Sequence, residues 1–186
     1  MRVLGIDCGT EYTGYGVVEL CTDDSLVCLT CGAIKLSARE TLPARLSTIF
    51  LRLGEIIVQH QPDDVAIEDI FYAVNVKSAL KLGQVRGVAM LAASSAGLDV
   101  AEYSPLSIKS AVVGYGRAEK QQVQHMVTRL LNLAEIPEPP DAADALSRGV
   151  SGCFVADVVI ERPVLVGSLH CTVIARDATE VRWIKG

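Results

Sequence analysis

Two acidic side chains occur where the sequence is otherwise strongly apolar. Asp7 ends the segment RVLGID, and Glu68 lies inside VAIEDIF. Burying a carboxylate is costly unless it is paired, hydrogen-bonded or bound to a metal ion. Neighbouring residues of a strand point to opposite faces, so only one of Glu68 and Asp69 can share a face with Asp7. Glu68 lies deeper in its apolar segment, and we expect it to be the functional one.

Two further acids, Asp141 and Asp144, lie three residues apart in PPDAADAL at the start of a predicted helix. This spacing points both side chains in the same direction. Acids at the N-terminal end of a helix also cap it and interact favourably with its dipole. That structural role explains Asp141 as well as a functional role does. It explains Asp144 less well, because the apolar residues Ala145 and Leu146 follow it.

Four carboxylates that met at one point would repel one another, and divalent cations would relieve the repulsion. Mg²⁺ and Mn²⁺ prefer such hard oxygen ligands. Two ions about 4 Å apart support phosphodiester hydrolysis, in which one activates water and the other stabilises the leaving 3′ oxygen. The three histidines, at positions 60, 125 and 170, show no ligand spacing. The acids therefore indicate a metal-dependent nuclease, provided that the fold brings them together.

The elements that must position these acids follow a mixed α/β pattern. Short connections between the first three predicted strands favour an antiparallel meander. Strands and helices alternate after that, so the fourth strand can lie parallel beside the first, with helices on both faces of a five-stranded mixed sheet. The predicted strands are 2–7, 13–20, 26–36, 65–71 and 98–103, and the predicted helices are 43–60, 77–95, 105–116 and 118–133. Another helix is predicted within 137–149, with its prolines outside the helix and Asp141 at the cap position.

The composition is typical of a soluble globular protein: the chain has 186 residues, of which 50% are hydrophobic and 21% charged. We see neither an apolar stretch of about 18 residues, as a membrane helix needs, nor a secretory signal. We therefore expect a cytoplasmic protein with reduced cysteines. Cys28 and Cys31 form a CxxC motif in a predicted strand, where positions i and i+3 face opposite sides. This geometry favours separate thiols over a zinc site.

The charge is unevenly distributed along the chain. The net charge is −5, yet residues 73–131 are net basic and the parts on either side are net acidic. An electropositive face for an anionic partner and a set of ordinary solvated helices explain this distribution equally well.

Five segments, in this order, carry a family resemblance: GIDCGTEYTGYGVV, VAIEDIF, SALKLGQVRGVAM, GYGRAEKQQVQHMV and DAADAL. Together they resemble the RuvC family of bacterial Holliday junction resolvases, over about residues 1–150. The resemblance implies an RNase H-like fold and a homodimer that nicks four-way DNA junctions symmetrically in recombination and repair. It implies two Mg²⁺ ions per active site, with Mn²⁺ as a substitute, and 5′-phosphate and 3′-hydroxyl ends. It also implies a partnership with the RuvA–RuvB branch-migration complex.

The resemblance further assigns roles to residues. The catalytic and metal-binding acids that it implies are Asp7, Glu68, Asp141 and Asp144. An aromatic that stacks against junction bases falls on Phe71, with Tyr72 beside it, although an aromatic at a strand end is more often part of the core. Lys109 and Lys120 fall near the scissile phosphate. The basic residues that would follow the DNA backbone are Lys77, Lys81, Arg86, Lys109, Arg117 and Lys120.

Two other regions concern assembly and the C-terminal end. In the family, the helix that contains SALKLGQVRGVAML helps to form the dimer interface, although its pattern alone indicates only a core-facing helix. Beyond the resemblance, Gly149 and Gly152 are expected to weaken the last helix, and two or three strands are predicted after it. We therefore expect an RNase H-like nuclease domain over 1–153 and a C-terminal extension over 154–186.

Three other classes of protein would share part of this sequence pattern. GIDCGT also resembles the phosphate-binding turn of sugar kinases and actin-like ATPases, but those proteins need two such domains, and neither a second turn nor a GxxxxGK[ST] motif is present. A non-catalytic junction-binding module would not need all four acids. An RNase H-like nuclease with another substrate, such as an RNA–DNA hybrid, would share the same fold.

Overall fold

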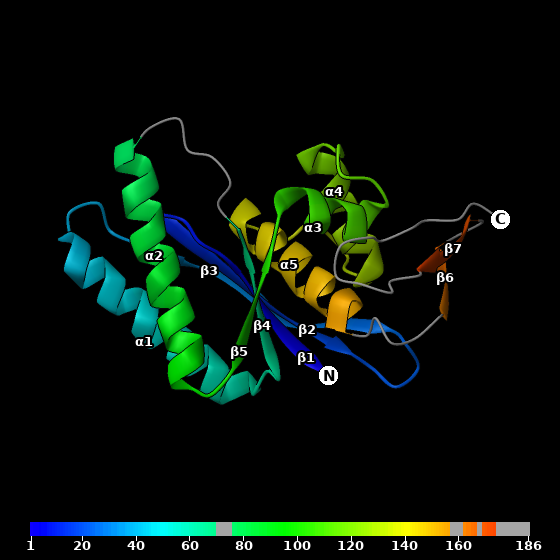
Figure 1. The fold of residues 1–186 in the computed structure, drawn as a ribbon, viewed down its shortest axis with the longest axis horizontal. Helices are drawn as coiled ribbons and strands as arrows, with labels where there is room; N and C mark the ends of the chain where they lie inside the picture. The colour runs from blue at the N-terminus through cyan, green and yellow to red at the C-terminus, as the bar shows by residue number, and fades with distance from the viewer. Residues whose placement is uncertain (70–75, 157–161, 167–168, 174–186) are drawn as a thin grey trace.

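The computed structural model describes residues 1–69, 76–156, 162–166 and 169–173. Its centre is a five-stranded sheet with the order β3-β2-β1-β4-β5 (Figure 1). β1, β2 and β3 pair antiparallel, while β4 pairs parallel with β1 and β5 pairs parallel with β4. The predicted mixed sheet is confirmed. The strands are β1 (Arg2–Asp7), β2 (Tyr12–Leu20), β3 (Leu26–Lys35), β4 (Asp64–Glu68) and β5 (Asp99–Tyr103).

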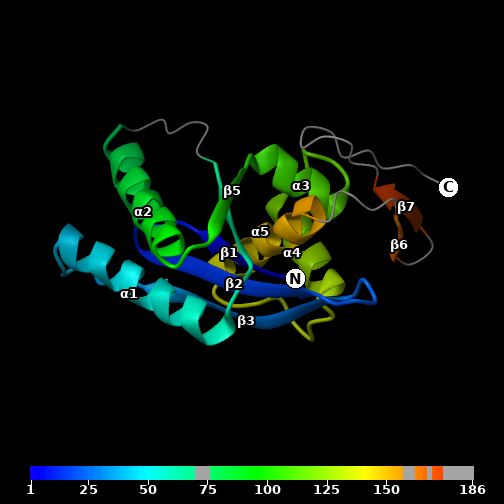
Figure 2. The ribbon, with the colours of Figure 1, turned by 60° about the horizontal axis from the view of Figure 1, so that its bottom comes forward.

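Helices cover both faces of the sheet, as predicted (Figure 2). On one face lie α1 (Leu42–His60) and α2 (Val76–Ser95). On the other lie α3 (Pro105–Val113), α4 (Lys120–Leu130) and α5 (Pro140–Ala156). Among the described residues, no helix is both long and apolar enough to cross a membrane.

Local sequence signals explain where several of these helices begin. Proline occupies the first turn of α1 and of α3, where its missing N–H costs no hydrogen bond. The Ser104 hydroxyl caps α3 by accepting a hydrogen bond from the Ser107 N–H at 3.0 Å. Glu119 and Gln122 form a capping box that starts α4.

The alternation of side chains along the strands separates two cores. On β1, Leu4 and Ile6 point toward α1 and α2, where they join a cluster that includes Leu53. Val3 points to the opposite face, where it joins Leu146 and other residues of α3, α4 and α5. All of these side chains are almost fully buried. The central strand is therefore apolar on both faces, as its sequence predicts.

Glycines allow α5 to lie very close to the sheet. A methyl group on Gly5 of β1 would lie 2.0 Å from the carbonyl oxygen of Ala145 and 2.5 Å from the backbone nitrogen of Gly149. A methyl group on Gly152 would lie 2.6 Å from Val3 Cγ1. α5 continues through both Gly149 and Gly152 to its end at Ala156, although glycines are expected to weaken a helix. Close packing on the sheet offsets their low helix propensity.

The two cysteines of the CxxC motif also differ from expectation. Val17 of β2 pairs with Thr30 and Val18 pairs with Cys28, so β3 contains an extra residue at this point. This bulge changes the alternation of side chains, and the thiols of Cys28 and Cys31 are hydrogen-bonded to each other. The hydrogen bond raises the pKa of Cys28 and lowers the pKa of Cys31 to about 7. The prediction that the two thiols face opposite sides is therefore wrong.

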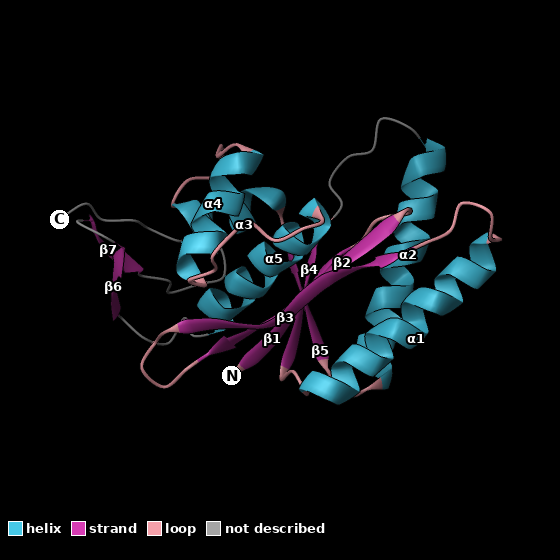
Figure 3. Cartoon of the chain, turned by 180° about the vertical axis from the view of Figure 1, so that it is seen from behind, coloured by secondary structure: helices cyan, strands magenta, loops and turns pink. Residues whose placement is uncertain are grey.

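The C-terminal part contains two strands, β6 (Arg162–Val166) and β7 (Leu169–Val173), which pair antiparallel in a separate sheet (Figure 3). The sequence pattern predicted two or three strands here. The boundary between the domain over 1–153 and the extension over 154–186 stays a prediction, and α5 runs across it.

The contact between α5 and the sheet gives a first prediction. Gly5→Ala should lower the free energy of unfolding by about 3 kcal/mol or more, because the new methyl group meets backbone atoms that cannot rotate away. Urea denaturation measures the change. Gly54→Ala is the matched control: nothing lies within 4 Å of its added methyl group in α1, and it should stabilise by about 0.5–1 kcal/mol. Equal stability of Gly5→Ala and the wild type would contradict the close contact.

Candidate active site

Two of the predicted acids end neighbouring strands at the same edge of the sheet. β1 and β4 are parallel, and Ile6 lies opposite Ile67 in their register. The next residues, Asp7 and Glu68, therefore lie side by side at the ends of the two strands. Asp69 points elsewhere and forms an ion pair with Arg86 at 3.6 Å. Glu68, which was preferred to Asp69 because it lies deeper in the apolar segment, is thus the acid that lies on the same face as Asp7.

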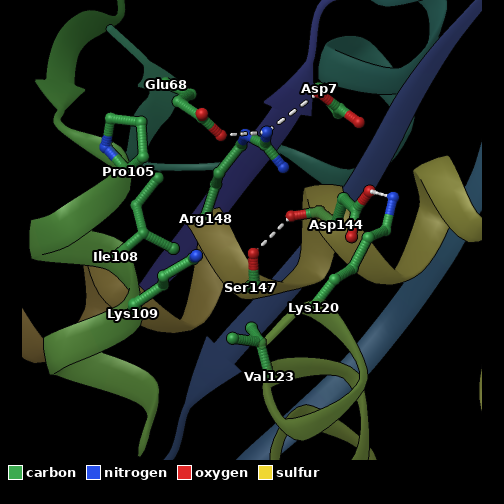
Figure 4. A pocket seen from close by; sticks show the side chains of 10 residues that line it. All are labelled: Asp7, Glu68, Pro105, Ile108, Lys109, Lys120, Val123, Asp144, Ser147 and Arg148. Atoms are coloured by element: carbon green, nitrogen blue, oxygen red, sulfur yellow. Dashed lines mark hydrogen bonds and ion pairs between the residues drawn. The ribbon is translucent and has the colours of Figure 1, made fainter. Parts of the chain in front are cut away.

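The other two acids come from the start of α5. The carbonyl oxygen of Asp141 packs over Gly14 of β2, where an added methyl group would lie 2.1 Å from it. Since Gly14 pairs with Asp7 across β1 and β2, this contact brings the first turn of α5 next to Asp7. Asp144, one turn further on, is partly buried and faces the same pocket as Asp7 and Glu68 (Figure 4).

The pocket is open to solvent and contains both acidic and basic side chains (Figure 4). β1, β4 and α5 supply its acids, while α3, α4 and α5 supply its lysines and its arginine. Asp141 is not one of its lining residues. The lining residues are Asp7, Glu68, Pro105, Ile108, Lys109, Lys120, Val123, Asp144, Ser147 and Arg148.

Arg148 joins the two strand-end acids. Its Nη2 lies 2.9 Å from Asp7 Oδ1 and also forms an ion pair with Glu68 Oε2. The Arg148 residue is only 6% exposed, so this is a buried guanidinium between two carboxylates. Arg148 is not among the residues expected from the sequence. The signal that could have identified it is its position one helical turn after Asp144, among the small and apolar residues of DALSRGVSGC.

A second cation neutralises Asp144. Lys120 Nζ lies 2.5 Å from Asp144 Oδ2, which raises the pKa of Lys120. Gln124 Nε2 also donates to Asp144, at a long 3.5 Å. Lys109 lines the same pocket. The two lysines that the resemblance places near the scissile phosphate therefore lie beside the acids.

The electrostatics of Asp7 connect all four acids. Burial raises the pKa of Asp7 from 3.8 to about 6, against the opposing effect of the Arg148 guanidinium. The negative charges of Asp144, Asp141 and Glu68 also contribute to this rise, less than burial does. The predicted acids thus act on one carboxyl group, although they come from three distant parts of the chain.

The remaining predicted residues lie further from the pocket or are engaged elsewhere. Lys77 and Lys81 are exposed at the start of α2, and Arg117 is exposed before α4. The Arg86 side chain is only 15% exposed, pairs with Asp69 and Glu102, and donates from Nε to the carbonyl oxygen of Glu68 at 3.2 Å. The two predicted aromatics, Phe71 and Tyr72, lie outside the described residues.

The donor set suits a divalent cation in its chemistry, since carboxylate oxygens are the ligands that hard cations prefer. Among the residues that the structure describes, however, no three or more Asp, Glu, His or Cys side chains are arranged so that they could hold an ion. Side-chain cations stand between the carboxylates instead: Arg148 between Asp7 and Glu68, and Lys120 on Asp144. The carboxylates are present, and their charge is partly balanced by cations from within the chain.

A 3-2-1-4-5 mixed sheet with acids at the ends of its two central strands defines an RNase H-like fold. The family model described as "Crossover junction endodeoxyribonuclease RuvC" matches residues 3–151. The chain therefore belongs to the RuvC family of crossover junction endodeoxyribonucleases.

Individual relatives agree with this assignment. The RuvC of Koribacter versatilis is 63% identical over 147 residues, which cover 79% of this chain and 89% of that protein. The solved Thermus thermophilus RuvC is 33% identical, with a TM-score of 0.79 over 88% of this chain and all of that one. The T. thermophilus RuvC solved in complex with a Holliday junction substrate has a TM-score of 0.78 at 32% identity, over 84% of this chain and 96% of that one.

The raised pKa of Asp7 gives a second prediction, for protein kept metal-free with a chelator. Because the folded protein disfavours the ionised carboxylate, Asp7→Asn should increase the free energy of unfolding at pH 8, by about 1–3 kcal/mol. Well below pH 3.8, Asp7 is largely protonated in both states, so the difference should be small. It should grow as the pH rises from about 3, through the folded-state pKa of about 6, and level off near pH 7. Chemical denaturation across this range measures it, and a pH-independent difference would contradict the assigned shift.

Proposed function

We propose that this protein is a structure-specific endonuclease that resolves four-way DNA junctions by paired symmetrical nicks, leaving 5′-phosphate and 3′-hydroxyl ends. The observation that carries the proposal is the pocket in which Asp7, Glu68 and Asp144 meet, with Asp141 acting on Asp7, in a chain of the RuvC family. Family membership makes a nuclease with divalent-metal chemistry the expected class, and the proposal specifies Mg²⁺, with Mn²⁺ as a substitute.

Asp7, Glu68, Asp141 and Asp144 would hold the metal in this proposal. When bound, divalent cations supply an activated water and neutralise the leaving 3′ oxygen. The chain's own lysines have a separate task. Lys109 and Lys120 lie at the pocket, and the Lys120 side chain is 62% exposed. Both can therefore contact a phosphate that enters from solvent and hold it beside the carboxylates.

The DNA-contacting surface extends beyond the pocket. Lys77, Lys81 and Arg117 are exposed and can follow the phosphate backbone. The proposed stacking aromatics, Phe71 and Tyr72, follow β4, which ends at the pocket. Arg86 has its guanidinium committed to the protein's own carboxylates and to the backbone of Glu68. We therefore assign Arg86 to positioning the end of β4.

A homodimer would suit a junction whose strands are related by two-fold symmetry, with one active site for each strand. The outer face of α1 and α2 offers a surface for it. Leu80, Gln84, Gly87 and Leu91 form one exposed stripe at helical spacing on α2, with Leu80 64% and Leu91 56% exposed. Exposed apolar patches of this kind mark interaction surfaces. A second copy of the chain is the proposed partner at this surface of α2. The proposal also places the protein in the cytoplasm, where it acts together with the RuvA–RuvB complex.

The function is tested by a cleavage assay that compares three substrates, with Mg²⁺ present: a four-way junction, a linear duplex and an RNA–DNA hybrid. We expect cleavage of the junction only, at symmetrical positions. Asp7→Asn should abolish cleavage and leave junction binding by gel shift intact, since the carboxylate acts in chemistry. Asp99→Asn, at an exposed carboxylate on β5, is the control and should cleave normally. Preferred cleavage of the hybrid would favour another RNase H-like activity, and binding without any cleavage would favour a non-catalytic junction-binding module.

The dimer gives a fourth prediction. Leu91→Glu places a charge in the middle of the proposed apolar contact, so light scattering after gel filtration should show a shift from dimer to monomer. Leu106→Glu is the matched control, because Leu106 is similarly exposed, at 62%, but lies on α3 across the sheet. A monomeric wild type, or a Leu91→Glu variant that stays dimeric, would exclude this surface.

A further inference from the structure

The guanidinium of Arg148 stands between two of the carboxylates that are assigned as metal ligands. We propose that Arg148 is a built-in counter-ion: it neutralises Asp7 and Glu68 in the metal-free protein, and a divalent cation must displace it to bind both carboxylates. The inference rests on the proposed function for the assignment of the ligands, and it concerns how the site is loaded.

The first support is geometric. Asp7 and Glu68 come from two neighbouring strands, and Arg148 reaches both from α5, on one face of the sheet (Figure 4). A single nitrogen, Nη2, makes both ion pairs, so the positive charge occupies the space between the two carboxylates. An ion that bridged Asp7 and Glu68 would need that space.

The second support is the balance of charge. Asp7 experiences the negative charges of Glu68, Asp141 and Asp144, and burial adds to their effect. Arg148 opposes this field, and Lys120 pairs with Asp144. Buried carboxylates need such compensation whenever no metal is bound. The two side-chain cations balance only part of the charge of four acids, so the pocket still attracts a divalent ion.

The third support is that Arg148 is incompletely satisfied. Its Nε is buried and has no hydrogen-bond partner among the described residues. A guanidinium that is fixed permanently usually makes a two-point contact through two nitrogens, whereas here both contacts share Nη2. The Arg148 side chain is therefore held mainly by charge, and a stronger cation can replace it without breaking a wider hydrogen-bond network.

The displacement has two opposite consequences. The apparent metal affinity equals the intrinsic affinity multiplied by the fraction of molecules in which Arg148 has left the two carboxylates, so a small fraction weakens binding. The metal-free fold is stabilised, because the acids would otherwise repel one another. Removing the guanidinium should therefore tighten metal binding and lower the stability of the metal-free fold. Loss of a purely structural arginine would not produce this combination.

The experiment is a titration of the full chain with Mn²⁺, in which electron paramagnetic resonance measures the free ion, without DNA and without any measure of cleavage. Arg148→Gln keeps a polar side chain of similar reach, and Arg148→Leu removes all polarity. Both should bind Mn²⁺ about tenfold or more tightly than the wild type. Both should also melt at a lower temperature in a chelator and show a larger rise in melting temperature when Mn²⁺ is added.

Arg2→Gln is the matched control. Arg2 lies at the other end of β1, where its Nε pairs with Glu19 at 3.0 Å, and its loss should leave Mn²⁺ affinity unchanged. Equal or weaker binding by both Arg148 variants would overturn the inference while leaving the ligand assignment in place. Absence of Mn²⁺ binding in the wild type and in every variant would instead overturn the ligand assignment. If Arg148→Leu does not fold, Arg148→Gln decides the outcome.

Discussion

The close approach of α5 to the sheet is the contact on which the active site depends. Glycines on both surfaces remove the side chains that would separate them, so backbone atoms of the helix lie almost against β1 and β2. This fixes Asp141, Asp144 and Arg148 at a set distance from Asp7 and Glu68. Helix propensity would predict that glycines at 149 and 152 end the helix, but packing over its length outweighs that local cost.

Charge balance is the second constraint, and it follows from the first. A fold that gathers four acids at the end of two buried strands accumulates repulsion that its apolar core must overcome. Two cations reduce this repulsion: Arg148 of α5 pairs with Asp7 and Glu68, and Lys120 of α4 pairs with Asp144. α5 therefore supplies two of the acids and also the arginine that compensates the other two.

Much of this was readable from the sequence, because the relevant signals are local. The strand period showed that only one of Glu68 and Asp69 can share a face with Asp7, and the deeper position of Glu68 in its apolar segment favoured Glu68. Short turns followed by alternating strands and helices predicted the mixed sheet. The missed features depend on contacts between distant segments. Arg148 gains its role only when α5 meets β1 and β4, and Cys28 and Cys31 come together only because the pairing of β2 and β3 shifts by one residue. Arg86 was expected to contact DNA, because the sequence does not show that Asp69 and Glu102 pair with its guanidinium in the fold.

The order of the acids along the chain has a consequence for biosynthesis. Asp7 and Glu68 leave the ribosome well before Asp141 and Asp144, and at about 5–20 residues per second the interval lasts roughly 4–15 seconds. During that interval, the strands of the sheet can pair, but α5 is not yet available to pack against the glycines of β1 and β2. A nascent chain of this kind contains two of the four proposed catalytic acids and lacks Arg148. Translation itself thus delays the assembly of the proposed active site until nearly all of residues 3–151, the part matched by the family model, has been made.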